Sequence, residues 1–243
     1  MPFTFSHPAI IVPFLRRSRF FSTTGLIAGS LVPDFEYFFN LQKGTSHFSH
    51  TLAGLVLFDW PTGLMACFLF HFFVKFPLAV HLPLSWYQRV QPFLNLSWQK
   101  LFFRHFLALS FSLLFGALLH IGWDIVVHQT ADLLAPLFVS PNASAPAVAE
   151  MKFYYLVWLL YSAAGALLLL VVFLNLPRQN AVPPPSNKAP YWMLVLGLTA
   201  VVSGVHMRGN PYYSVDDMAV IGIAYFLLFL LLVSAGWLRK IKH

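Results

Sequence analysis

The feature that most constrains this chain is a series of long apolar runs separated by short polar segments. A helix needs about 20 predominantly apolar residues to cross the hydrocarbon core of a bilayer. Such runs lie at about 51–74, 105–128, 153–176, 191–207 and 217–238. A sixth, weaker run at 20–39 is interrupted by glycine and proline. The sequence therefore predicts an all-α, polytopic helical membrane protein with about six transmembrane helices.

Composition supports the same class. Only 9% of the 243 residues are charged, against about 25% in soluble domains, and 58% are hydrophobic. Six spans leave no room for a sizeable soluble domain, so residues 1–243 are predicted to form a single integral-membrane domain. The run at 3–15, broken by Pro8 and Pro13, is too short to span and predicts a re-entrant or interfacial helix. With Cys67 as the only cysteine, an intramolecular disulfide and a cysteine-based zinc site are excluded.

The distribution of Lys and Arg predicts the orientation. With a cytoplasmic N-terminus, the cytoplasmic segments carry 12 basic residues and the outer segments carry 3, which agrees with the positive-inside rule. If the weak span at 20–39 is omitted and the C-terminus stays inside, the division becomes 9 against 6. Six spans with both termini in the cytoplasm therefore fit better. The basic residues are scattered, so the net charge of +7 does not indicate nucleic-acid binding.

Acidic residues and potential metal ligands gather at one predicted face. Seven of the eight acidic residues fall in outer loops or at outer span ends, and only Asp59 lies deeper within a span. A carboxylate or imidazole within a membrane is costly and suggests function by default. The predicted ligands at this face are Asp34, His47, His50, His120 and Asp124, with His128 beside them. Their shared depth predicts one site at the outer face.

The strongest pair is His120 and Asp124. Their i, i+4 spacing places them on one helix face about 6 Å apart, where they can offer a nitrogen and an oxygen to one metal ion. His128 continues this stripe one turn later and could serve a second ion or accept a proton. The alternative is a hydrogen bond between His120 and Asp124 that only braces helix packing.

The remaining candidates come from the N-terminal part. His47 and His50 could be a ligand pair, or they could belong to a polar helix start. Asp34 could be a carboxylate ligand with Glu36 as a general base, or both could be solvated residues at a helix end. His7 joins an outer-face site only if the run at 3–15 enters the protein, and it cannot do so from a cytoplasmic surface helix.

These motifs also carry a resemblance. The opening Met-Pro-Phe-Thr-Phe-Ser-His-Pro-Ala, the Gly-Ser-Leu-Val-Pro-Asp-Phe-Glu-Tyr-Phe at 29–38, and segments 47–54 and 120–128 resemble a bacterial membrane family catalogued as domain of unknown function 4184. Their order is similar to that in bacterial inner-membrane metal-dependent hydrolases and, more distantly, in zinc-dependent phospholipase C. The resemblance implies an inner-membrane location and a divalent metal, zinc by preference. The later His-x-x-x-Glu motif of the phospholipases is missing, so a three-zinc site is not implied.

The leading functional hypothesis is a membrane-embedded metal-dependent hydrolase acting on a lipid or lipid-like phospho- or carboxyl-ester. The metal ligands would be Asp34, His50, His120 and Asp124, completed by His47, His7 or His128, with Glu36 and His128 as candidate catalytic residues. One alternative is an ion- or proton-coupled transporter, which Asp59 and the broken run at 20–39 favour. The other is a structural membrane protein in which the His/Asp cluster is a polar clamp.

Overall fold

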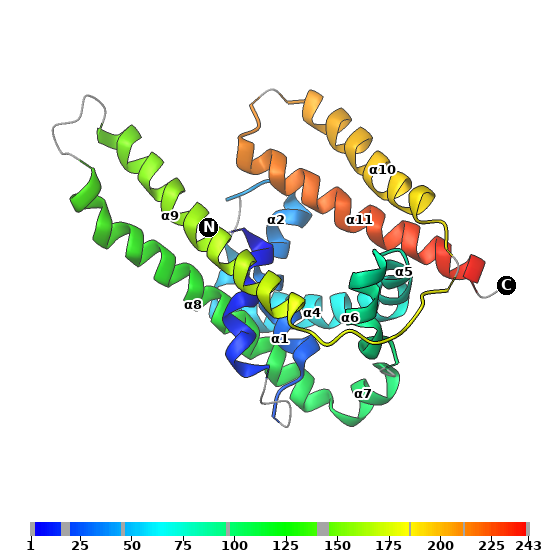
Figure 1. The fold of residues 1–243 in the computed structure, drawn as a ribbon. Coiled ribbons are helices and arrows are strands. Elements are labelled where there is room, and N and C mark those ends of the chain that lie inside the picture. Colours follow the sequence, from blue (N-terminus) through cyan, green and yellow to red (C-terminus); the bar gives the residue numbers. More distant parts are fainter. Residues whose placement is uncertain are drawn as a thin grey trace. The chain divides into compact units, whose positions relative to one another are not determined.

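The computed structural model describes residues 3–15, 20–44, 47–95, 98–139, 146–184, 186–210 and 212–241. Within these ranges all regular secondary structure is helical (Figure 1). The chain divides into two compact units. The first unit consists of Met1–Pro33, His50–Gly63 and Leu107–Asn175, and the second of Asp34–Ser49, Leu64–Phe106 and Leu176–His243.

Each unit combines long and short helices. The first contains the 3-10 helix η1 (Thr4–Phe14), α1 (Thr23–Gly29), α3 (Leu52–Gly54), the π-helix η4 (Leu55–Asp59), α8 (Phe106–Phe138) and α9 (Pro146–Leu174). The second contains α2 (Phe35–Asn40), the π-helix η5 (Phe70–Val74), α5 (Lys75–Val80), α6 (Leu84–Leu94), α7 (Trp98–Arg104), α10 (Lys188–Arg208) and α11 (Val215–Ile241). The chain passes between units within η2 (Val32–Asp34), η3 (Phe48–His50) and α4 (Trp60–Leu69), at the first residue of α8, and just after α9.

Five helical segments of the described chain are long and apolar enough to cross a membrane. They are Leu52–Val80, Phe106–Phe138, Ala149–Leu174, Lys188–Arg208 and Val215–Leu238. Each coincides with one of the five strong apolar runs, which confirms the all-α polytopic class. Leu52–Val80 is a continuous series of α3, η4, α4, η5 and α5, so two π-helical turns lie inside this span.

The weak run at 20–39 is not one of these five segments. α1 ends at Gly29, the short η2 follows, and α2 ends at Asn40, followed by Leu41 with a left-handed φ of 52°. Pro33 lies at the break, where its ring and its missing N–H prevent a continuous α-helical ladder. The sixth predicted transmembrane helix is therefore replaced by short helices.

The N-terminal run lies against a membrane-spanning helix. The Phe3 N–H donates to Ser162 Oγ of α9 at 2.8 Å, and a Cβ added to Gly165 would lie 2.9 Å from the Ser6 carbonyl oxygen. His7 on the same 3-10 helix is completely buried. The run is thus not a surface helix but packs inside the first unit, and its re-entrant course through a membrane stays a prediction.

The two long helices of the first unit, α8 and α9, run side by side in opposite directions (Figure 1). Val127 and Ala131 of α8 and Val157 of α9 form a buried cluster between them. Thr130 Oγ1 and Tyr161 Oη lie 3.2 Å apart along the same interface. The short helix η1 packs against α9 of this pair, and α1 packs against α8.

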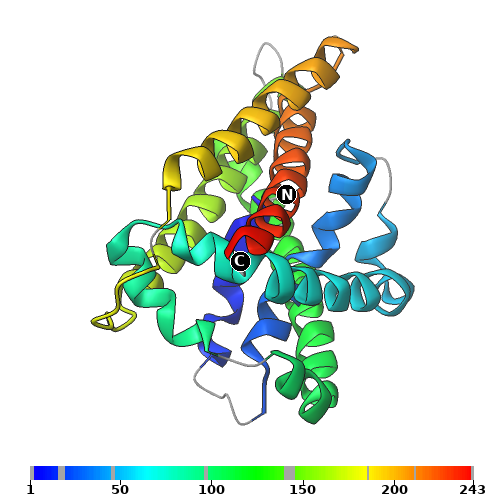
Figure 2. The same cartoon turned by 90° about the vertical axis from the view of Figure 1, so that its right-hand side faces the viewer.

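In the second unit, α10 and α11 form an antiparallel pair (Figure 2). The hydroxyls of Tyr191 and Ser234 join them at 2.8 Å in the buried interior. At the start of α11, Asp217 Oδ2 accepts from the Ser214 N–H at 3.0 Å, and the Asp217 N–H donates to Ser214 Oγ at 3.1 Å. This reciprocal arrangement is a capping box that satisfies backbone donors at the helix end.

Candidate metal centre

Asp124 is the centre of a buried cluster in the first unit. Its Oδ1 lies 3.2 Å from His7 Nε2. Its Oδ2 lies 3.6 Å from His50 Nε2 and 3.6 Å from His120 Nε2. The carboxylate therefore faces one imidazole with one oxygen and two imidazoles with the other.

Three separate parts of the chain supply this cluster. His7 comes from η1, His50 from the end of η3, and His120 and Asp124 from consecutive turns of α8. Ligand atoms of His50, His120 and Asp124 all lie within 4.8 Å of one another, which is a spacing that can hold a metal ion. The i, i+4 pair is thus joined by two histidines that are distant in sequence.

Backbone carbonyls orient two of the imidazoles. His7 Nδ1 lies 3.1 Å from the Thr4 carbonyl oxygen, and His120 Nδ1 lies 2.8 Å from that of Ser30. A carbonyl oxygen can only accept, so each Nδ1 carries the proton. In a neutral ring the Nε2 lone pair then points toward Asp124. Histidine ligands of metals are commonly held in this way.

The three imidazole rings of the cluster pack against one another. The His7 and His120 rings are stacked, with centroids 3.9 Å apart and planes 12° apart. The His50 ring meets the His120 ring edge-on, with centroids 5.5 Å apart. This packing holds the rings in the orientation in which each Nε2 faces Asp124.

Close helix contact places the Ser30 carbonyl beside His120. A Cβ added to Gly29 would overlap the Leu113 carbonyl oxygen of α8, and one added to Gly116 would lie 2.6 Å from the Leu26 carbonyl oxygen. Ser112 Oγ accepts from the Ser22 N–H at 2.8 Å, at the start of α1. Small residues at this interface let the two backbones approach.

The cluster is closed on most sides. His7 and His120 are completely buried, and the Asp124 side chain is 6% exposed. The His50 side chain, at 12%, is the most exposed of the four. His50 is therefore the member of the cluster that is most accessible from the surface of the described protein.

Asp34 and Glu36 belong to the second unit. Asp34 is buried and directly follows Pro33, and its role as a ligand stays a prediction. Glu36 is also buried, and its Oε2 accepts a hydrogen bond from the Ser49 N–H at 2.9 Å. Glu36 thus anchors the backbone one residue before His50, and its role as a base stays a prediction.

His47 is exposed in the second unit, with Nδ1 3.5 Å from the Tyr37 hydroxyl, and its role as a ligand stays a prediction. Within the first unit, the structure does not bring His128 into the cluster. The His128 ring, half-buried on α8, packs edge-on against Trp158 with centroids 5.7 Å apart. The helical stripe predicted from residue 120 onward therefore contributes its first two members only.

Sequence reasoning missed the carbonyl groups of Thr4 and Ser30 as the groups that orient the ligands. Backbone atoms leave no residue-type signature. An indirect signal was available, because Gly25-x-x-x-Gly29 and Ser112-x-x-x-Gly116 both have the small-residue spacing of closely packed membrane helices. That pairing predicts a contact between α1 and α8, and the Ser30 carbonyl follows directly after α1.

Comparison with known proteins identifies one family. The family model described as Domain of unknown function (DUF4184) matches residues 1–235. No curated protein and no solved structure matches the chain. The resemblance seen in the N-terminal motifs is thereby confirmed at the level of this family, while the similarity to metal-dependent hydrolases stays a prediction.

Proposed function

Because the chain belongs to the DUF4184 family, whose description assigns no activity, we propose its function from the cluster itself. We infer a membrane-embedded metal-dependent hydrolase that cleaves a phospho- or carboxyl-ester of a lipid or lipid-like substrate. The observation that carries this proposal is a single buried carboxylate, Asp124, faced by three imidazole Nε2 atoms.

The donor set suits a transition-metal ion. Imidazole nitrogen and carboxylate oxygen are ligands that zinc takes in proteins. His50, His120 and Asp124 would hold the ion, and three protein ligands leave a position open, as catalytic zinc sites do. Zinc bound there would lower the pKa of a water molecule to about 7 and so supply a nucleophile at neutral pH.

We assign proton transfer to His7. Its ring faces Oδ1 of Asp124, whereas His50 and His120 face Oδ2. With Nδ1 bonded to the Thr4 carbonyl, His7 Nε2 can take a proton from the attacking water and return it to the leaving oxygen. This assignment differs from the sequence-based expectation, which made His7 a metal ligand.

The membrane setting agrees with this chemistry. The five apolar helical segments are compatible with an integral membrane protein. We place the protein in the bacterial inner membrane on the basis of the resemblance, with both termini in the cytoplasm on the basis of the basic-residue distribution. A substrate that keeps its tail in lipid would then bring its ester to the cluster.

A second candidate function is an ion- or proton-coupled transporter. It is favoured by Asp59, a completely buried carboxylate at the end of the π-helical turn η4 inside the first span. π-helical turns often occur at functional sites, and carboxylates within spans commonly mark ion pathways. Ester hydrolysis by purified protein in detergent separates the two candidates, because a transporter would show none.

The proposal is tested first by elemental analysis of purified wild type, Asp124→Asn and Asp132→Asn. Asp124→Asn keeps the side-chain shape but removes the charge, so we expect weaker metal retention, by roughly tenfold or more. Asp132→Asn alters another carboxylate of α8, which faces Tyr154, and it should retain metal like wild type. Metal-free wild type would end the hydrolase proposal, and equal zinc content in Asp124→Asn and wild type would remove Asp124 from the ligand set.

The role of His7 is resolved in the same preparations. His7→Gln should keep its metal and lose ester hydrolysis, because only proton transfer is removed. Loss of metal from His7→Gln would instead make His7 a ligand, as the sequence suggested.

A further inference from the structure

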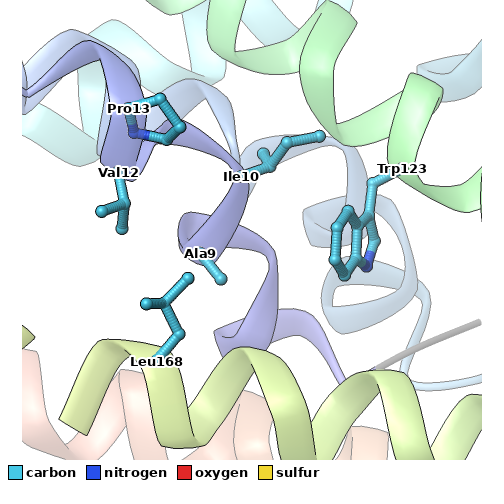
Figure 3. A pocket seen from close by; sticks show the side chains of 6 residues that line it. All are labelled: Ala9, Ile10, Val12, Pro13, Trp123 and Leu168. Carbon is cyan, nitrogen blue, oxygen red and sulfur yellow. The ribbon is translucent and has the colours of Figure 1, made fainter. Parts of the chain in front are cut away.

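An open apolar groove lies between residues of η1, α8 and α9 in the first unit (Figure 3). Its volume of about 610 Å³ falls within the range of about 300–1,000 Å³ typical of small-molecule sites. The described residues that line it are Ala9, Ile10, Val12, Pro13, Trp123 and Leu168. All six are apolar or aromatic, so the groove suits a hydrocarbon ligand.

The groove and the cluster are built on the same elements. Ala9 follows His7 by two residues on η1, about 4 Å along a 3-10 helix. Trp123 immediately precedes Asp124 on α8. Its indole is held edge-on against Tyr161, with ring centroids 5.4 Å apart. The groove and the cluster thus share η1 and α8, with lining residues one or two positions from Asp124 and His7 along the chain.

The surroundings of the groove determine what can enter it. Trp123 and Leu168 belong to two membrane-spanning segments. Only 11% of the most apolar stretch of the Leu168 segment is buried within the described protein, against 33% for α8. In a bilayer the apolar molecules available to such a surface are lipids, since water is scarce in the hydrocarbon core.

We propose that the groove binds one acyl chain of a membrane lipid and presents the ester of that lipid to the cluster. The proposal rests on the hydrolase function inferred above and specifies its substrate class as an acyl lipid drawn from the bilayer. The groove would then determine the preferred chain length, because each methylene that fits adds buried apolar area.

Two neighbouring leucines provide a test. Leu168→Trp fills the groove from α9, whereas Leu167→Trp adds the same bulk at an exposed position outside the lining. Dipalmitoyl phosphatidylglycerol is titrated into each detergent-solubilised protein, and bound lipid is counted by native mass spectrometry. Leu168→Trp should weaken lipid binding by about tenfold, while Leu167→Trp should bind like wild type.

Hydrolysis supplies the second measurement, with p-nitrophenyl butyrate and p-nitrophenyl palmitate as probes. For Leu168→Trp, kcat/KM should fall about tenfold on palmitate and stay unchanged on butyrate. Equal lipid binding by the two tryptophan variants would overturn the groove proposal even if wild type is an active hydrolase. Loss of binding in Leu168→Trp alone, with no hydrolysis by any variant, would keep the groove and reject the hydrolase.

Discussion

At the residue scale, His81 shows how burial changes the pKa of a side chain outside the membrane-spanning segments. It caps α5 in the second unit, and Nδ1 donates to the Pro77 carbonyl oxygen at 2.6 Å. Its ring stacks on Tyr191, with centroids 4.1 Å apart. Burial lowers the pKa of His81 and the charge of Lys188 lowers it further, while the bond to Pro77 opposes them in part.

This shift predicts a pH dependence of stability. The unfolded chain, with a histidine pKa near 6.5, takes up this proton more readily than the folded protein. Stability should therefore fall as pH drops below about 6.5, and His81 should have no such effect above that pH. Thermal unfolding in detergent from about pH 8 to about pH 5 should show a shallower decline for His81→Phe than for wild type. His105→Gln, at an exposed position, is the control, and equal slopes for His81→Phe and wild type would contradict the prediction.

At the scale of elements, the contact between α1 and α8 supports the candidate metal centre. Gly25 and Gly29 face the backbone of α8, and Gly116 faces that of α1. This approach positions the Ser30 carbonyl, which orients His120. The close packing of α1 on α8 therefore fixes the orientation of the His120 imidazole.

Gly29→Ala should separate α1 from α8 and so move the Ser30 carbonyl away from His120. The added methyl would overlap the Leu113 carbonyl oxygen, so the helices must separate, at a cost of about 1–3 kcal/mol. The Ser30 carbonyl should move with α1, and retained metal should fall. Gly122→Ala, between His120 and Asp124, is the matched control because no atom lies within 4 Å of its added Cβ. Thermal unfolding and elemental analysis of both variants provide the measurement, and similar behaviour of the two would refute the role of the contact.

At the scale of the whole molecule, the open question is how residues 20–40 pass through the bilayer. Five segments can span, and the basic-residue distribution favours six crossings. The sixth would have to be made by short helices, of which α1 is one. Broken helices are tolerated at membrane depth where protein covers their backbone groups.

Cysteine labelling of intact cells tests this topology. The only native cysteine, Cys67, is buried and can be replaced by alanine. Single cysteines at 45, 140 and 212 should all react with an impermeant maleimide from outside, whereas one at 180 should react only after permeabilisation. If position 45 reacts only from the cytoplasm, residues 20–40 do not cross, and the six-crossing topology is wrong.

The sequence by itself determined the helical membrane class, because apolar length is a local property of each segment and lipid leaves few alternatives. It also determined the His120–Asp124 pair, because helical geometry places residues i and i+4 on one face. The sequence did not determine the structure of the run at 20–39. Mean apolarity does not reveal that the helical hydrogen bonding is interrupted at Pro33.

Only the tertiary structure decided which distant residues join that pair. His7 lies 117 positions from Asp124, and sequence alone left its run either inside the protein or on the surface. The choice depended on η1 packing against α9, and on α1 approaching α8 closely enough to place a carbonyl on His120. The small-residue spacing indicates that α1 and α8 can approach, but the packing of η1 against α9 arises from several helices together and has no such local pattern.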